Sequence, residues 1–135
     1  MNDVASDPRI AGLFAAADDG ELLIGGQRAS VLAEQADDTP LFIYDRGVID
    51  RRIAHLRAAM PDEILLHYAI KANPWQPVVD HIAKQVDGLD IASAGELDFA
   101  LASGTDPAHI SFAGPGKRDR ELEAAIAAGV TLNIE

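Results

Sequence analysis

The sequence contains no cysteine, has half as many basic as acidic residues and lacks any long apolar run. Without cysteine there are no disulfide bonds, thiolate metal sites or thiol nucleophiles, so covalent chemistry must come from another side chain. Lysine and arginine number 11 against 22 aspartates and glutamates, and the formal charge of -11 repels nucleic-acid phosphates. We therefore expect no nucleic-acid partner, and we attribute the charge to a solvated surface.

Signals for membrane insertion and for secretion are also missing. No segment approaches the roughly 18 to 20 apolar residues that a bilayer-spanning helix needs. The N-terminus has neither the basic start nor the apolar stretch of a secretion signal. We therefore expect a cytoplasmic protein without a membrane partner. We also expect no metal site, because metal-ligand spacing is absent among the four histidines, which are His55, His67, His81 and His109.

The second half of the chain alternates between predicted strands and predicted helices. The strands are expected at residues 64–70, 89–92, 109–113 and 131–134. The helices between them are expected at residues 77–85, 94–102 and 119–128. A strand begins about every 20 to 25 residues, which suits right-handed βα units with a parallel sheet. This pattern fits a (β/α) barrel or a doubly wound sheet. A complete barrel needs about 250 residues, so we expect the chain to be a fragment.

The first half has weaker and more varied patterns. Residues 22–24 predict a strand that ends in a turn at Gly25 and Gly26, and a short helix is expected to begin at Ser30. Residues 40–44 predict a buried strand. An amphipathic helix then follows, capped by Asp45 and stopped by Pro61, with apolar residues at helical spacing at Ile49, Ile53, Leu56 and Met60.

Lys71 is the main candidate for covalent chemistry. It lies at the carboxyl end of the strand expected at 64–70, and alternation places His67 and Ala69 on its face. The carboxyl end of parallel strands is where ligands bind in α/β folds. A desolvated lysine can lose its proton and form a Schiff base, which arginine cannot do. Position alone leaves a solvated flank as the commoner role of such a lysine.

Five segments, in the same order, resemble one family of enzymes. Residues 67–74, HYAIKANP, resemble the cofactor-lysine segment of the alanine-racemase-like fold, in the branch of ornithine, arginine and diaminopimelate decarboxylases. The other four are TPLFIYD at 39–45, GLDIASAGEL at 88–97, ISFAGPGK at 110–117 and LNIE at 132–135. Residues 87–93 and 111–119 are most similar to the decarboxylases associated with exosortase and exopolysaccharide gene clusters. Alanine racemases continue their Lys-Ala-Asn with Ala-Tyr-Gly-His-Gly, whereas this chain has PWQP at 74–77, which disfavours a racemase.

The resemblance implies a fold and a domain organisation. The fold is α/β, a parallel (β/α)8 TIM-type barrel of the alanine-racemase-like class, of which only the first half is present. Residues 1–44 would form an N-terminal lead-in and one strand of a second, β-rich domain. Residues 45–135 would form the first half of the barrel that binds pyridoxal phosphate.

The resemblance also implies a reaction and its residues. Pyridoxal phosphate would be bound as a Schiff base by Lys71, with Asp90 near the cofactor at the end of the second barrel strand. The protein would decarboxylate an amino acid of the diaminopimelate, ornithine, arginine or lysine type as a homodimer. The 135-residue chain alone is expected to be inactive, because the family's phosphate loop and ring-nitrogen partner would lie beyond it. The alternatives are a truncated, non-catalytic chain that binds a cofactor or a partner, and a racemase of the same fold.

Three features have a structural alternative. Asp90 is also explained as a strand-end aspartate that bonds local backbone. Glu96 matches a glutamate of the family, but Ser93 and Glu96 also have the spacing of a capping box, which we favour. Residues 114–117, GPGK, lack the spacing of a phosphate-binding loop and are followed by Arg118 instead of a hydroxyl, so we expect a turn.

Overall fold

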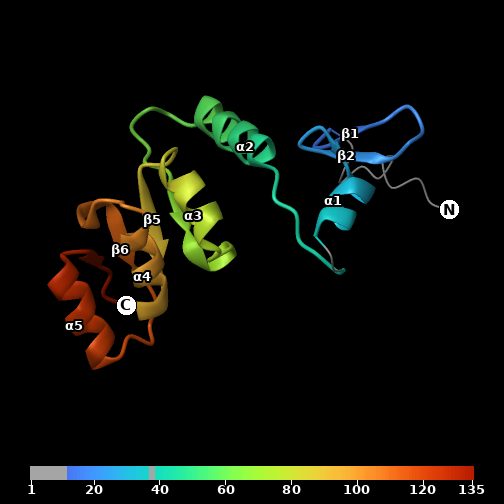
Figure 1. The fold of residues 1–135 in the computed structure, drawn as a ribbon. Coiled ribbons are helices and arrows are strands. Elements are labelled where there is room, and N and C mark those ends of the chain that lie inside the picture. The colour runs from blue at the N-terminus through green and yellow to red at the C-terminus, as the bar shows by residue number, and fades with distance from the viewer. Residues whose placement is uncertain (1–11, 37–38) are drawn as a thin grey trace. The chain divides into compact units, whose positions relative to one another are not determined.

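The structure is a computed structural model that describes residues 12–36 and 39–135 (Figure 1). The chain divides into two compact units, Met1–Arg52 and Ile53–Glu135, with the boundary inside helix α2, Arg46–Ala59. The boundary expected between residues 44 and 45 concerns the domains of a complete protein and stays a prediction. None of the helices in the described ranges is both long enough and apolar enough to cross a membrane.

The first unit contains a small antiparallel sheet and a short helix. Strands β1 (Ala15–Ala16), β2 (Leu22–Ile24) and β3 (Gln27–Arg28) pair in that order, and helix α1 spans Ala29–Gln35. Gly25 and Gly26 have φ angles of 58° and 80°, as the two central residues of a tight hairpin turn require. The strand, the turn and the helix expected in this region are therefore confirmed.

The buried strand expected at residues 40–44 is wrong for this structure. Those residues pair with no strand in the described parts of the chain, and the side chains of Phe42 and Tyr44 are 88% and 46% exposed. An apolar run becomes a buried strand only where a neighbouring strand pairs with its backbone and a second layer covers its side chains. The local sequence signals apolarity but supplies neither partner.

Helix α2 begins with the aspartate expected to cap it. Asp45 Oδ1 accepts hydrogen bonds from the backbone N–H of Gly47 at 2.7 Å and of Val48 at 3.3 Å. These bonds satisfy donors of the first helical turn, which have no partner within the helix itself. The helix ends at Ala59, two residues before Pro61, so both of its predicted boundary signals are confirmed.

The second unit is a parallel sheet with helices between successive strands. Strands β4 (His67–Ala69), β5 (Gly88–Ile91), β6 (Ile110–Phe112) and β7 (Thr131–Leu132) pair in parallel in that order. Helices α3 (Gln76–Ala83), α4 (Ala94–Ala102) and α5 (Asp119–Ala128) connect them. Each strand lies beside the next one in the chain, which is the order of a barrel, whereas a doubly wound sheet reverses its order at a switch point.

One face of this sheet and the helices form the core. The fully buried side chains with the largest volumes are Phe112, Ile70, Leu89, Ile91, Ile110 and Val79. Burying each of them contributes about 1.5–3 kcal/mol relative to leaving it exposed. Because side chains alternate along a strand, the residues between these apolar ones, such as Asp90 and Ser111, belong to the opposite face.

Gly88 allows two neighbouring segments to approach β5 closely. A Cβ atom at this position would lie 2.3 Å from the backbone oxygen of His109 and 2.6 Å from Cε1 of His67. His67 is also the register partner of Gly88 on β4. The imidazole of His67 therefore packs against the Gly88 backbone.

Strand β4 is shorter at its start than the sequence predicts, because a side chain takes one of its backbone donors. Asp87 Oδ2 accepts the N–H of Leu66 at 2.6 Å, and the N–H of Asp87 donates to the Leu66 oxygen at 2.9 Å. Arg57 Nη2 of helix α2 lies 2.5 Å from the same carboxylate. The Leu66 N–H, and after it the Arg57 guanidinium, lower the pKa of the Asp87 carboxyl below its usual value. Asp87 therefore attaches the end of α2 to the amino edge of the sheet.

Candidate active site

Lys71 lies directly beyond the carboxyl end of strand β4. The strand ends at Ala69, and residues Ile70–Ala72 form a 3-10 turn in which the N–H of Asn73 donates to the Ile70 oxygen at 3.0 Å. The strand ends one residue before its predicted end, so strand alternation does not fix the direction of the Lys71 side chain. Lys71 is exposed, and its amine makes no hydrogen bond or ion pair with the residues that the structure describes.

The turn that carries Lys71 is held from both sides. Ile70 is fully buried in the core, and the Tyr68 hydroxyl donates to the Asn73 oxygen at 3.1 Å. The side chain of Asn73 also accepts the N–H of Trp75 at 3.1 Å, at the start of helix α3. These contacts fix the backbone on either side of Lys71, so its amine is mobile only through the side chain.

The chain has three lysines, and the other two differ from Lys71 in their surroundings. Lys117 Nζ donates to the oxygens of Gly114 at 2.6 Å and Asn133 at 2.8 Å, and lies 5.4 Å from the centroid of the Phe112 ring. Lys84 is the C-terminal cap residue of α3, which in a βα unit lies at the amino edge of the sheet. Of the three lysines, Lys71 alone both lies at the ligand-binding edge of the sheet and has an amine that bonds to none of the described residues.

The turn expected at residues 114–117 is confirmed. Gly114 has a φ of 119°, a conformation that side chains disfavour, and its N–H donates to Glu135 Oε1 at 3.0 Å. The Lys117 bonds described above join this turn to the end of β7. The amine is thus used to hold two segments together.

Asp90 forms a pair with Ser111 on the face of the sheet opposite the core. Asp90 is the register partner of Ala69 on β4 and of Ser111 on β6. The Ser111 hydroxyl donates to Asp90 Oδ1 at 2.9 Å. The alternative that Asp90 bonds local backbone is therefore wrong, because its partner is a side chain on the next strand. Contact between Asp90 and a cofactor stays a prediction.

The capping role expected for Ser93 is confirmed, whereas the reciprocal bond expected from Glu96 to the backbone of Ser93 is wrong. Ser93 Oγ accepts the N–H of Glu96 at 3.2 Å. Glu96 Oε2 accepts the N–H of Ala92 at 2.8 Å, whereas a capping box would direct it to Ser93. The glutamate thus stabilises the turn between β5 and α4 through the N–H of Ala92, one residue before the N–H that the motif predicts.

Glu121 joins the starts of two helices and was not singled out from the sequence. Its carboxylate accepts the N–H of Arg118 at 3.0 Å and the N–H of Ala94 at 3.1 Å. These N–H groups, Arg118 first, lower the pKa of the Glu121 carboxyl below its usual value. The spacing of Glu121 from Arg118 is a local capping signal. The bond to Ala94 depends on how α4 and α5 pack and has no signal in the sequence.

Replacing Ser93 by alanine should lower the free energy of unfolding by about 0.5–2 kcal/mol, because one N–H of the first turn of α4 loses its acceptor. Glu96→Ala should have a comparable or smaller effect. Urea denaturation of the variants measures both. Glu123→Ala is the control, since this exposed α5 residue has no partner in the described chain. Unchanged stability of Glu96→Ala with a sharp loss of cofactor affinity would favour a functional role for Glu96 instead.

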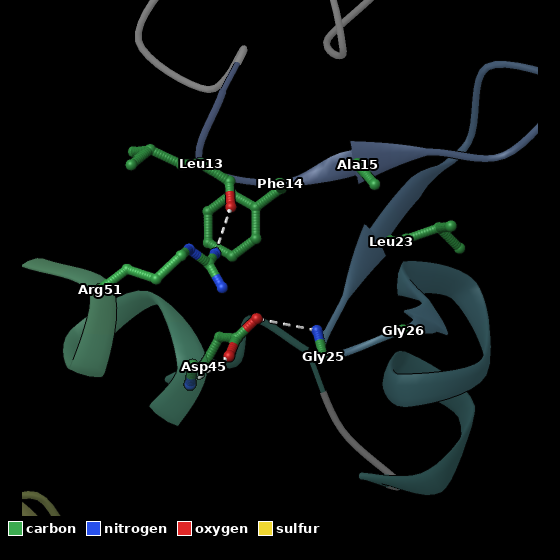
Figure 2. A pocket seen from close by; sticks show the side chains of 9 residues that line it. Leu13, Phe14, Ala15, Leu23, Gly25, Gly26, Asp45 and Arg51 are labelled. Atoms are coloured by element: carbon green, nitrogen blue, oxygen red, sulfur yellow. Dashed lines mark hydrogen bonds between the residues drawn. The ribbon is translucent and has the colours of Figure 1, made fainter.

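A hollow of about 370 Å³ opens in the first unit (Figure 2). Both of its charged side chains are engaged: Asp45 Oδ2 accepts the N–H of Gly25 at 2.9 Å, and Arg51 Nη2 donates to the Leu13 oxygen at 3.1 Å. These bonds attach the hairpin to the start of α2. Neither Lys71 nor Asp90 lines this hollow, so it does not gather the residues singled out from the sequence.

No group of three or more potential metal ligands occurs among histidine, aspartate and glutamate side chains within residues 12–36 and 39–135. Lys71 and the Asp90–Ser111 pair are the candidate residues for chemistry at this edge of the sheet. A primary amine without a competing partner fits the aldehyde group of a carbonyl cofactor, and a carboxylate supplies negative charge on the face of the sheet away from the core.

Comparisons with known proteins identify a family. Residues 46–135 match the profile of the pyridoxal-dependent decarboxylase family, pyridoxal binding domain. Diaminopimelate decarboxylase of Aquifex aeolicus is 38% identical over 118 residues, which are 87% of this chain and 28% of that protein. The Staphylococcus aureus 2-[(L-alanin-3-ylcarbamoyl)methyl]-2-hydroxybutanedioate decarboxylase is 39% identical over 90 residues, which are 66% of this chain and 22% of that protein.

Solved structures agree with the sequence matches. A crystal structure of an Aquifex aeolicus protein superposes with a TM-score of 0.82 at 37% identity, covering 91% of this chain and 30% of the other. Diaminopimelate decarboxylase of M. jannaschii in complex with L-lysine has a TM-score of 0.76 at 29% identity, covering 90% of this chain and 29% of the other. The chain thus spans less than a third of the length of these relatives.

Proposed function

The chain belongs to the pyridoxal-dependent decarboxylase family, and on this premise we propose that it provides the cofactor lysine, Lys71, of an enzyme that decarboxylates an amino acid. Its four parallel strands, in sequential order, are the first half of a TIM-type barrel of the alanine-racemase-like class. The observation that carries the proposal is the position of Lys71 at the carboxyl edge of this sheet, on a fixed turn and with an unengaged amine.

The cofactor implied by the family is pyridoxal phosphate, and the residues present fit it. When bound, its pyridine ring accepts the electron pair that remains when the α-carboxylate leaves as carbon dioxide. The Lys71 amine would bind the aldehyde carbon of the cofactor, and the turn anchored by Ile70 and Asn73 would set its position. Asp90 would add negative charge on the face of the sheet away from the core.

The relatives support a proposal for the substrate class. Several relatives are diaminopimelate decarboxylases, and two solved structures from M. jannaschii and Helicobacter pylori contain L-lysine. We accordingly propose an amino acid of the diaminopimelate, ornithine, arginine or lysine type as the substrate. The resemblance to the family also supports a cytoplasmic homodimer.

The test uses the complete protein, meaning this chain together with the rest of its barrel and its second domain. After incubation with pyridoxal phosphate and reduction with borohydride, peptide mass mapping should find the cofactor on Lys71. Release of carbon dioxide is then assayed with diaminopimelate, ornithine, arginine and lysine. Cofactor on Lys84 or Lys117 with Lys71 unmodified would contradict the site assignment.

The alternatives predict other results. A native protein with an intact mass of 14.3 kDa would indicate a truncated, non-catalytic chain. A racemase would convert the substrate to its other enantiomer without releasing carbon dioxide. The isolated chain of 135 residues is a further control. We expect it to bind the cofactor weakly and to decarboxylate none of the four amino acids, because it lacks the facing half of the barrel.

A further inference from the structure

The Asp90–Ser111 pair lies between core residues of two strands but is not itself part of the core. Each partner sits between two core residues, Leu89 and Ile91 on β5 and Ile110 and Phe112 on β6, each of which is at most 1% exposed. Asp90 and Ser111 therefore lie together on the other face of the sheet, which is the inner face of a barrel. Side chains on that face are available to whatever the barrel binds at its carboxyl edge.

A serine is an unusual choice for this position if packing alone decides it. The inner layers of such barrels are filled mainly by bulky branched side chains, Val, Ile and Leu. An apolar residue at position 111 would fill more space but would leave Asp90 without a donor. Within the described residues the Asp90 side chain has no hydrogen bond other than the one from Ser111.

The hydrogen bond restricts Asp90 in a specific way. Oδ1 is held at 2.9 Å from the Ser111 hydroxyl, so the carboxylate cannot rotate freely, and Oδ2 remains for another partner. On the other side, the register neighbour of Asp90 is Ala69, whose side chain is a single methyl group two residues before Lys71. No bulky β4 side chain therefore stands beside Asp90 in the row that precedes the Lys71 turn.

We propose that Ser111 is a positioning residue, whose hydroxyl orients the Asp90 carboxylate toward the cofactor bound at Lys71. This inference rests on the proposed function. It assigns Ser111 no contact with the substrate or cofactor, and Asp90 Oδ2 is the atom that faces the bound group. The role requires a hydroxyl at position 111, and a side chain of similar size without one does not replace it.

The test compares Ser111→Thr with Ser111→Val in the complete protein, because these side chains have nearly the same shape and only threonine keeps the hydroxyl. The apo-proteins are titrated with pyridoxal phosphate, and the absorbance of the bound cofactor is followed against pH. Ser111→Val should bind the cofactor about tenfold more weakly, as expected for loss of a hydrogen bond to a charged group. The pH at the midpoint of the absorbance change of its bound cofactor should also be lower. Ser111→Thr should resemble the unaltered protein in both measurements.

A second pair of variants separates positioning from packing. In an Asp90→Ala background there is no carboxylate to orient, so threonine and valine at position 111 should give the same cofactor affinity. A purely structural role would keep their difference in both backgrounds and would also lower the thermal stability of the apo-protein. Ser111→Ala provides the same comparison if the valine variant fails to fold.

The outcomes for the two proposals are distinguishable. Borohydride labelling of Lys71 is measured in every variant. Labelled Lys71 together with equal affinity and equal pH response of the valine and threonine variants would overturn the role of Ser111 while the proposed function stands. Absence of label on Lys71 in the unaltered protein would overturn both.

Discussion

Replacing Lys71 by arginine should reduce decarboxylation by the complete protein to below detection while the protein stays folded. A guanidinium remains protonated at any accessible pH and has no primary amine for the cofactor aldehyde. Lys71 is exposed and its amine has no partner in the described chain, so the substitution removes no hydrogen bond and no ion pair there. Carbon dioxide release measures activity, and far-ultraviolet circular dichroism with thermal unfolding measures the fold.

Lys84→Arg is the matched control for this substitution. Lys84 is also exposed, but it caps helix α3 and lies at the other edge of the sheet. The variant should keep its activity and its borohydride label. Measurable turnover by Lys71→Arg would mean that another group binds the cofactor, and the role proposed for Lys71 would have to be abandoned.

A single methyl group at Gly88 should destabilise the protein strongly. The Cβ of Gly88→Ala would lie 2.3 Å from the backbone oxygen of His109, and this oxygen belongs to the segment that leads into β6. Relief requires β5 to move away from its neighbours, which weakens its pairing with β4 and β6. We expect a loss of about 1–3 kcal/mol or more in the free energy of unfolding, measured by urea denaturation.

Gly95→Ala is the control, because this glycine lies in helix α4 and its added Cβ would come no closer than 4.0 Å to Ser93 Oγ. Alanine is favoured over glycine within helices by up to about 1 kcal/mol, so this variant should be as stable as the unaltered protein or more stable. Adding His67→Ala to the Gly88→Ala protein should restore little of the lost stability, since the contact with the backbone oxygen of His109 remains. A fully stable Gly88→Ala protein would contradict the register between β4, β5 and β6.

The sequence predicts those elements whose ends are marked by local chemistry. Helices α4 and α5 occur at the residues where they were expected, and local residues mark their ends: Ser93 caps the first, and Gly129, in a left-handed conformation with a φ of 79°, ends the second. Strand β4 is shorter than expected because side-chain contacts that the apolar pattern does not show set both of its ends. Asp87 takes a donor at its start, and contacts of Tyr68 and Asn73 form the turn at its end.

The same distinction applies to the candidate site. Lys71 was found from its own strand and motif, which are local. The partner of Asp90 was missed because the pairing with Ser111 requires the register between two strands whose paired residues lie 21 positions apart. Apolar periodicity shows which face a residue occupies but does not show which residue of the next strand stands opposite it.

The two bonds of Glu121 have a consequence for attempts to redesign the substrate preference of such an enzyme. Loops at the carboxyl edge of a barrel are usually treated as separate modules that can be exchanged one at a time. Here the carboxylate that caps α5 at Arg118 also accepts the first N–H of α4 at Ala94. Grafting the loop after β6 without this glutamate would remove an acceptor from the helix after β5. The loop after β5 and the loop after β6 should therefore be transplanted together.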